Sequence, residues 1–236
     1  MEKNYNAEEV GKFSNYSENW WDESGEMKML HKFNPIRIEY IEKHITQNFD
    51  HQNDISILDI GCGCGILSEK LAQNHHQIVG IDPSFSNIKA AKKHAIQSGI
   101  NGLEYFQQDE FLETYNGKFD IILAMEVLEH VDNLDLFFNQ MLEFSKTNSL
   151  FIISTINKNI TSLIFAKFTA EYILNILPKG THDWKKFINP DNINQIAEKY
   201  GFKNIDICGV RYNPIVQNFA YSVKPLMNYF MCFKKC

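Results

Sequence analysis

Five short apolar runs, rich in β-branched and aromatic residues, recur along the chain. They lie at residues 55–60, 78–82, 103–107, 119–125 and 150–155. Helical patterns follow several of them, at residues 66–73, 84–97 and 134–144. Strands that alternate with helices in this way form βαβ units and pair into a parallel sheet. The sequence therefore predicts an α/β, doubly wound fold with a mostly parallel sheet.

The segments on either side of this alternation predict additions to the sheet. Residues 7–46 are predicted to be helical, with Asn34 as an N-cap and Pro35 at the first helical position. After the fifth run, the sequence predicts an apolar insert, a helix and two late strands, at 156–187, 191–200, 205–211 and 219–223. The length suits one domain over 1–236, with a helical cap at 1–50.

Charge and cysteine usage exclude several classes of protein. Lys and Arg total 23 against 29 Asp and Glu, so the net charge of -6 offers no broad basic surface for a phosphate backbone. We therefore expect no nucleic-acid partner. The 5 cysteines form no regular disulfide framework, which favours a reducing, cytoplasmic compartment. The polar N-terminus and the lack of a long charge-free apolar run predict neither a secretory signal nor a membrane span.

A glycine-rich turn, Asp59-Ile-Gly-Cys-Gly-Cys-Gly65, follows the first run. Gly61, Gly63 and Gly65 allow backbone amides and a helix N-terminus to approach a ligand closely. Asp82 ends the second run, where a carboxylate can accept two hydrogen bonds from a ribose diol. A dinucleotide-binding turn would need glycine where Ile66 stands. Cys62 and Cys64 have no second cysteine pair, so we interpret them as small turn residues and not as metal ligands.

Ionisable side chains follow the fourth run. Glu126, Glu129 and His130 come directly after this predicted strand, at the edge where α/β sheets bind ligands. Their spacing of i, i+3 and i+4 would place them on one face of a helix. Oxygen-rich ligands suit magnesium. In a metal-free site the histidine would only pack or form a hydrogen bond.

The glycine turn, Asp82 and Met125-Glu-Val-Leu-Glu-His-Val131 resemble class I S-adenosylmethionine-dependent methyltransferases. Further segments resemble the ubiquinone biosynthesis O-methyltransferase family. These are WWDESGEMKMLH at 20–31, NPIR at 34–37, AEYIL at 170–174, PKGTHD at 178–183, KFI at 186–188 and YNP at 212–214. The segment 145–148 departs from the pattern, since relatives usually turn there through Pro-Gly-Gly.

The resemblance implies the seven-stranded sheet of the class I type and S-adenosyl-L-methionine as cofactor. It implies cofactor contacts at Arg37, Gly61, Asp82 and Met125, to which the turn adds Asp59, Gly63 and Gly65. It also implies a divalent metal, Mg2+, at Glu126, Glu129 and His130. The substrates would be phenolic or catecholic hydroxyls of polyprenylated intermediates, of the 3-demethylubiquinol and 2-polyprenyl-6-hydroxyphenol types. A ubiquinone biosynthesis complex would be a further partner.

The chemistry of such a substrate needs a base or a metal. A phenol has a pKa of about 10, so a neighbouring group must remove its proton at neutral pH. The candidate catalytic residues are Glu126, His130 and His182, which stands beside Asp183. Three aromatic residues, Trp20, Trp21 and Phe33, either close over a ring substrate or fill the core.

The apolar insert has two interpretations. A helix over 162–177 would carry one narrow polar stripe, at Lys167, Glu171 and Asn175, opposite a wide apolar surface. Such a helix is either part of the core or an interfacial helix beside anionic head groups, with flanking lysines at 158, 179, 185 and 186. The second interpretation predicts a cytoplasmic protein at the inner face of the membrane.

The sequence also allows other functions. An NAD-dependent oxidoreductase shares the predicted fold, but the missing glycine at position 66 argues against it. A base-modifying nucleic-acid methyltransferase would often carry Asp/Asn-Pro-Pro-Tyr where Ala124-Met-Glu-Val stands. A different small-molecule O-methyltransferase and a non-catalytic binding module on the same fold are the remaining alternatives.

Overall fold

The computed structural model describes residues 4, 5, 10, 11, 14, 17–50, 55–115, 117–157 and 188–236. Within them the strands are β1 (Ser56–Ile60), β2 (Gln77–Asp82), β3 (Leu103–Gln107), β4 (Phe119–Met125), β5 (Ser145–Ile156), β6 (Phe202–Asn213), β7 (Asn218–Ser222) and β8 (Asn228–Lys235). The helices longer than one turn are α2 (Lys28–Asn48), α3 (Ile66–Gln73), α4 (Phe85–Gln97), α5 (Gln108–Thr114), α6 (Leu134–Phe144) and α8 (Pro190–Lys199).

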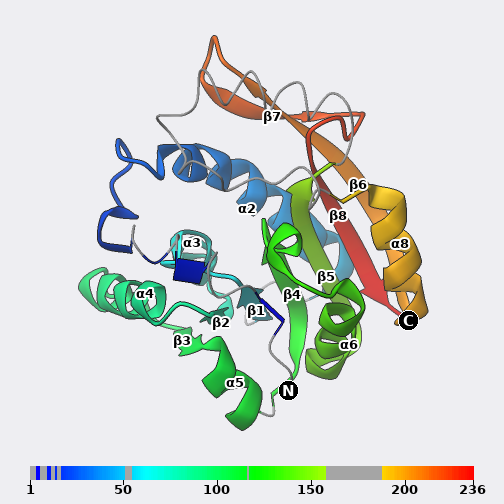
Figure 1. The fold of residues 1–236 in the computed structure, drawn as a ribbon, viewed down its shortest axis with the longest axis horizontal. Helices are drawn as coiled ribbons and strands as arrows, with labels where there is room; N and C mark the ends of the chain where they lie inside the picture. The colour runs from blue at the N-terminus through cyan, green and yellow to red at the C-terminus, as the bar shows by residue number, and fades with distance from the viewer. Residues whose placement is uncertain are drawn as a thin grey trace.

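The strands form one sheet in the order β3-β2-β1-β4-β5-β8-β6-β7 (Figure 1). Strands β1 to β5 pair in parallel, whereas β8 runs antiparallel between β5 and β6. The predicted mostly parallel, doubly wound sheet is therefore confirmed. It has 8 strands among the described residues where 7 were predicted, because β8 was missed.

Helices cover both faces of this sheet, and the side chains of β1 and β4 alternate between two apolar layers. Ile57, Ile121 and Leu123 pack with α2 and α3 on one face. Leu58 and Ile122 pack with α5, α6 and α8 on the other. A strand that is buried on both faces has a continuous apolar sequence. This is why β1 and β4 were predicted at nearly their observed limits.

Helix α2 differs from its prediction. It runs without interruption from Lys28 to Asn48, so the predicted N-cap at Asn34 and helix start at Pro35 are wrong. A buried apolar face on both sides of Pro35, from Phe33 to Ile45, holds the helix together despite the lost backbone donor. Asn34 instead donates from Nδ2 to the backbone oxygen of Ile66, at 3.1 Å. This bond ties α2 to the start of α3.

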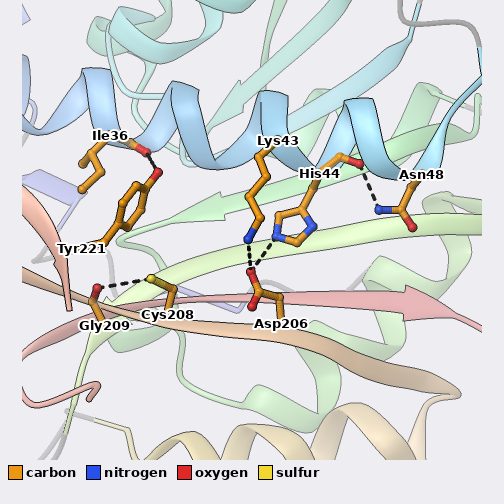
Figure 2. Close-up of polar contacts among 8 residues, drawn as sticks. All are labelled: Ile36, Lys43, His44, Asn48, Asp206, Cys208, Gly209 and Tyr221. Carbon is orange, nitrogen blue, oxygen red and sulfur yellow. Dashed lines mark hydrogen bonds and ion pairs between the residues drawn. The ribbon is translucent and has the colours of Figure 1, made fainter. Parts of the chain in front are cut away.

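Helix α2 is also fastened to the late strands (Figure 2). Lys43 Nζ and His44 Nε2 both lie within hydrogen-bond distance of Asp206 Oδ2 on β6, at 2.9 and 3.0 Å. Partial burial alone would raise the pKa of Asp206, but the bonds from Lys43 and His44 outweigh it and lower that pKa. At its other end, the Tyr221 hydroxyl on β7 donates to the backbone oxygen of Ile36, at 3.2 Å. The residues of α2 that face the sheet are thereby held in one position.

The segment 145–148, which departs from the family pattern, begins β5. Ser145 pairs with Phe119, and the register then shifts before Leu150 pairs with Ile121. Asn148 supplies the positive φ, of 60°, that this irregularity contains. Residues 158–187, with most of the predicted insert, lie outside the described residues. Among the helices of the described part of the chain, none is long and apolar enough to cross a membrane.

Candidate cofactor and catalytic site

The glycine turn lies at the carboxyl end of β1, where the strand order reverses between β1 and β4. Gly61, Gly63 and Gly65 have positive φ angles of 67°, 56° and 89°, a conformation that L side chains rarely adopt. Gly65 is the N-cap of α3, so the turn leads directly into the first helix. The predicted tight turn is confirmed. Ligands of α/β sheets bind at such a reversal point.

Asp82 reaches this turn from the end of β2. Its Oδ2 accepts a hydrogen bond from the backbone N–H of Gly63, at 3.1 Å. Its Oδ1 accepts from the backbone N–H of Ser84, at 2.8 Å, and from Asn87 Nδ2, at 3.2 Å. Burial raises the pKa of Asp82 to about 6, against the effect of these bonds. The carboxylate is therefore mostly ionised at neutral pH and able to accept further hydrogen bonds.

Asp59, the acid at the start of the motif, serves the framework of the turn. Its Oδ2 accepts from the Ser68 hydroxyl of α3, at 2.5 Å. Burial raises its pKa to about 6, while Ser68 and the positive charge of Arg37 act in the opposite direction. Asp59 thus fixes the turn against α3 and contributes negative charge opposite Arg37.

Arg37 is a buried guanidinium with unused donor capacity. Its Nη2 donates to Asn34 Oδ1, at 2.9 Å, and its guanidinium lies 5.4 Å from the centroid of the Phe33 ring. Its Nε has no hydrogen-bond partner among the described residues. Burial lowers the pKa of Arg37 to about 10, although the charges of Glu126 and Asp59 favour its ionised form. A carboxylate bound there would gain a buried cationic partner.

Glu126 immediately follows β4 and has a strained backbone, with φ at 60°. Its backbone N–H donates to the backbone oxygen of Ser154 at 3.0 Å, and its Oε2 accepts from Asn228 Nδ2 at 3.4 Å. Its Oε1 is buried and has no hydrogen-bond partner among the described residues. Desolvation, followed by the charge of Glu129, raises the pKa of Glu126 well above its usual value. This carboxylate is suited to accept a proton near neutral pH.

Glu129 and His130 follow Glu126 in a conformation that differs from the predicted helix. The chain forms a one-turn 3-10 helix, Leu128–His130, after the left-handed Glu126, so the three side chains do not share the α-helical face on which the prediction relied. Glu129 is buried and accepts from the Thr155 hydroxyl, at 2.7 Å. Within the described ranges, no group of three His, Cys, Asp or Glu side chains is arranged to hold a metal ion. Binding of Mg2+ by Glu126, Glu129 and His130 therefore stays a prediction.

The remaining candidates fall into different surroundings. Met125, the last residue of β4, is buried beside the turn's strand, in the same apolar layer as Ile57. Phe33 stacks on Phe230 at 5.7 Å between ring centroids and is a core residue. His130 is partly exposed at the end of the 3-10 helix. His182 lies outside the described residues.

Several residues that support the site were not predicted. Ser84, at the start of the helical pattern predicted at 84–97, caps α4 by accepting from the Asn87 N–H at 3.2 Å, and its own N–H donates to Asp82 Oδ1. Asn228 reaches Glu126 from β8, a strand that was itself missed. Nothing in the local sequence of Asn228 indicates this contact, because it joins side chains 102 positions apart and depends on the antiparallel pairing of β8 with β5.

Comparisons with known proteins identify relatives along the whole chain. A family described as a methyltransferase domain matches residues 33–207. The ubiquinone biosynthesis O-methyltransferase of Coxiella burnetii (strain Dugway 5J108-111) is 41% identical over 233 residues, which cover 98% of this chain and 97% of the relative. The protein of the same name from Pelagibacter ubique (strain HTCC1062) is 38% identical, with 98% of each chain covered.

Solved structures agree in fold. Magnesium protoporphyrin IX methyltransferase from Synechocystis PCC 6803 with bound SAM has a TM-score of 0.64 at 15% identity, covering 99% of this chain and 100% of that one. A SAM-dependent methyltransferase from Aquifex aeolicus has a TM-score of 0.62 at 13% identity, with 96% and 98% covered. At these identities the likeness concerns the fold alone.

Proposed function

Because this chain belongs to the ubiquinone biosynthesis O-methyltransferase family, it is an S-adenosylmethionine-dependent O-methyltransferase, and we propose that it methylates phenolic or catecholic hydroxyls of polyprenylated intermediates. The observation that carries the proposal is the meeting of three groups at one sheet edge. These are the glycine turn after β1, Asp82 after β2 and Glu126 after β4. Membership of this methyltransferase family excludes the interpretation as an NAD-dependent oxidoreductase.

The cofactor would be held by residues from three elements. The carboxylate of Asp82 would accept the ribose hydroxyls, and the positive φ angles of Gly61, Gly63 and Gly65 would give the turn beside the cofactor its shape. The unused Nε of Arg37 would donate to the carboxylate of the methionine moiety. S-adenosylmethionine supplies the electrophilic methyl group on its sulfonium.

Glu126 is the proposed general base. The phenolic proton passes to its carboxylate as the phenolic oxygen forms a bond to the methyl carbon. Bound S-adenosylmethionine would supply the methyl group to the phenolic oxygen, and the products would be a methyl ether, protonated Glu126 and S-adenosylhomocysteine. The unpartnered Oε1 of Glu126 is the acceptor atom in this step. His130 and His182 remain second candidates for the same role.

Replacing Asp82 by alanine is expected to weaken cofactor binding by about 1.5–3 kcal/mol, the range for losing a charge-assisted hydrogen-bond acceptor. Isothermal titration calorimetry with S-adenosylmethionine measures this loss. Asp120 is a matched control, because its Oδ2 also accepts from a backbone N–H, that of Ser56 at 3.0 Å, but at the amino end of β4. Asp120→Ala should lower the melting temperature and keep the wild-type affinity. Wild-type affinity in Asp82→Ala would reject the ribose assignment.

We further propose that the enzyme is cytoplasmic and attaches to the inner face of the membrane through the apolar segment 162–177, which lies outside the described residues. Its support is the family's polyprenylated substrate, whose tail stays in the bilayer, and the wide apolar surface of the segment. Replacing Ile164, Phe168 and Ile173 by serine is expected to reduce sedimentation with anionic liposomes without lowering the melting temperature. Three core substitutions would instead each cost about 2–5 kcal/mol, so a collapsed melting temperature would contradict the membrane interpretation.

A further inference from the structure

We propose that residues 17–21 form a cover over the cofactor turn, and that Trp21 and His94 are positioning residues that hold this cover in place and slow cofactor release. The proposal rests on the proposed function, because the turn must hold S-adenosylmethionine for the cover to act on it. It assigns a role to Trp20 and Trp21, for which the sequence allowed either contact with the substrate or packing in the core.

The cover touches the turn at Gly63 and Cys64. Trp21 Nε1 donates to the backbone oxygen of Cys64, at 3.1 Å. The Cys64 thiol lies 3.8 Å from the backbone oxygen of Ser17. A Cβ at Gly63 would lie 2.9 Å from Cζ2 of Trp20, so the Trp20 ring covers the side of the turn that Gly63 leaves open. Trp20 is 7% exposed and packs with Met27, Cys64 and Ile66.

The Trp21 ring is clamped from the side of α4. It stacks on the His94 imidazole with 3.5 Å between ring centroids and an interplanar angle of 5°. His94 Nδ1 lies 2.9 Å from both carboxylate oxygens of Glu69, a buried residue of α3. Because Glu69 binds one nitrogen of the ring, it fixes the plane on which the Trp21 ring rests.

This clamp joins the two helices that begin at the cofactor site. Helix α3 starts directly after the glycine turn, and α4 starts three residues after Asp82. Trp21 therefore joins the turn to α4 with one hydrogen bond and one stacked pair, and the His94–Glu69 contact extends the connection to α3. On the other side, His31 Nε2 lies 2.9 Å from the backbone oxygen of Trp20, which connects the cover to α2.

The cover has little regular structure of its own, consisting of the 3-10 helix Ser17–Asn19 and a turn. Segments outside the regular helices and strands open locally at a lower free-energy cost than the core, and such openings gate ligand exchange in many enzymes. The contacts of Trp21 and His94 thus determine how often the cover opens. Once they are weakened, bound cofactor should leave faster, whereas the reacting groups stay unchanged.

The test measures release of radiolabelled S-adenosylmethionine from the full chain, chased with unlabelled cofactor. We expect Trp21→Ala and His94→Ala each to raise the dissociation rate by about tenfold, since affinity differences among variants of one site lie mainly in this rate. The KM for cofactor should rise more than kcat falls. Trp21→Phe keeps an aromatic ring but loses the bond to Cys64, so its rate should lie between those of wild type and Trp21→Ala.

His76→Ala is the matched control, because it removes a similar imidazole–carboxylate pair, that of His76 Nε2 and Glu42 Oε1 at 3.1 Å, beside the start of β2. It should lower the melting temperature and leave the dissociation rate at the wild-type value. Absence of binding by the wild type would overturn the proposed function. Wild-type binding with unchanged rates in the folded Trp21 and His94 variants would overturn the cover. If Trp21→Ala fails to fold, His94→Gln, at a position with 31% of its side chain exposed, decides the matter in the same way.

Discussion

Glu126→Gln is expected to lower kcat by about 10²–10⁴-fold, the range that a general base contributes. Glutamine keeps the size of the side chain and the contact to Asn228, but its amide cannot take the phenolic proton. S-adenosylmethionine affinity, measured by calorimetry, should remain near that of the wild type, because the base acts on the substrate. The turnover assay uses a short-chain polyprenyl catechol with saturating cofactor.

Glu129→Gln separates this role from that of a metal ligand. The negative charge of Glu129 raises the pKa of Glu126, so its removal should lower that pKa. Activity rises with pH as the base ionises, and this rise should therefore move to lower pH in Glu129→Gln while turnover persists. If both variants and chelator-treated wild type instead lose activity together, the general-base assignment is contradicted and a metal must be placed at this edge.

Gly63→Val is expected to abolish cofactor binding. The residue has φ at 56°, where a side chain costs about 1–2 kcal/mol, and its Cβ would lie 2.9 Å from the Trp20 ring. The valine would displace the Trp20 ring and shift the N–H that binds Asp82. The physical reason thus differs from the one the sequence suggests, in which the side chain only blocks the ligand's approach.

Gly99→Val is the matched control for backbone strain. Gly99 also has a positive φ, of 63°, but a Cβ there would meet nothing within 4 Å. Both variants should be less stable because valine is strained at a positive φ, and thermal denaturation measures this loss. Only Gly63→Val should also lose cofactor binding. Normal binding by a folded Gly63→Val would show that the turn is not the cofactor site.

The elements of the parallel half were predictable because their signals are local. Strands β3 and β4 and helices α3 and α6 have the predicted limits, and α4 (Phe85–Gln97) differs from the predicted 84–97 by one residue. In each case a short buried run or an amphipathic period is bounded by residues with capping or turn chemistry. The spacing of the glycines likewise predicted the turn. Residues other than glycine rarely have a left-handed backbone at three positions so close together.

Non-local packing decided what the sequence did not predict. Helix α2 continues through Pro35 because burial against the sheet outweighs a local breaker. Strand β8 exists through antiparallel pairing with β5 and β6, which a single apolar run does not specify.

The candidate site likewise contains residues that the sequence predicted and contacts that only the structure showed. The sequence alone determined the cofactor turn and the acid that follows the next strand, because each depends on a few adjacent residues. Only the tertiary structure showed that Glu126 has a left-handed backbone and that Glu129 lies in a 3-10 turn, so that the expected α-helical spacing does not hold. Only it placed Trp20 against Gly63 and Trp21 against His94, since these contacts join segments about 40 or more residues apart and depend on how α3 and α4 pack.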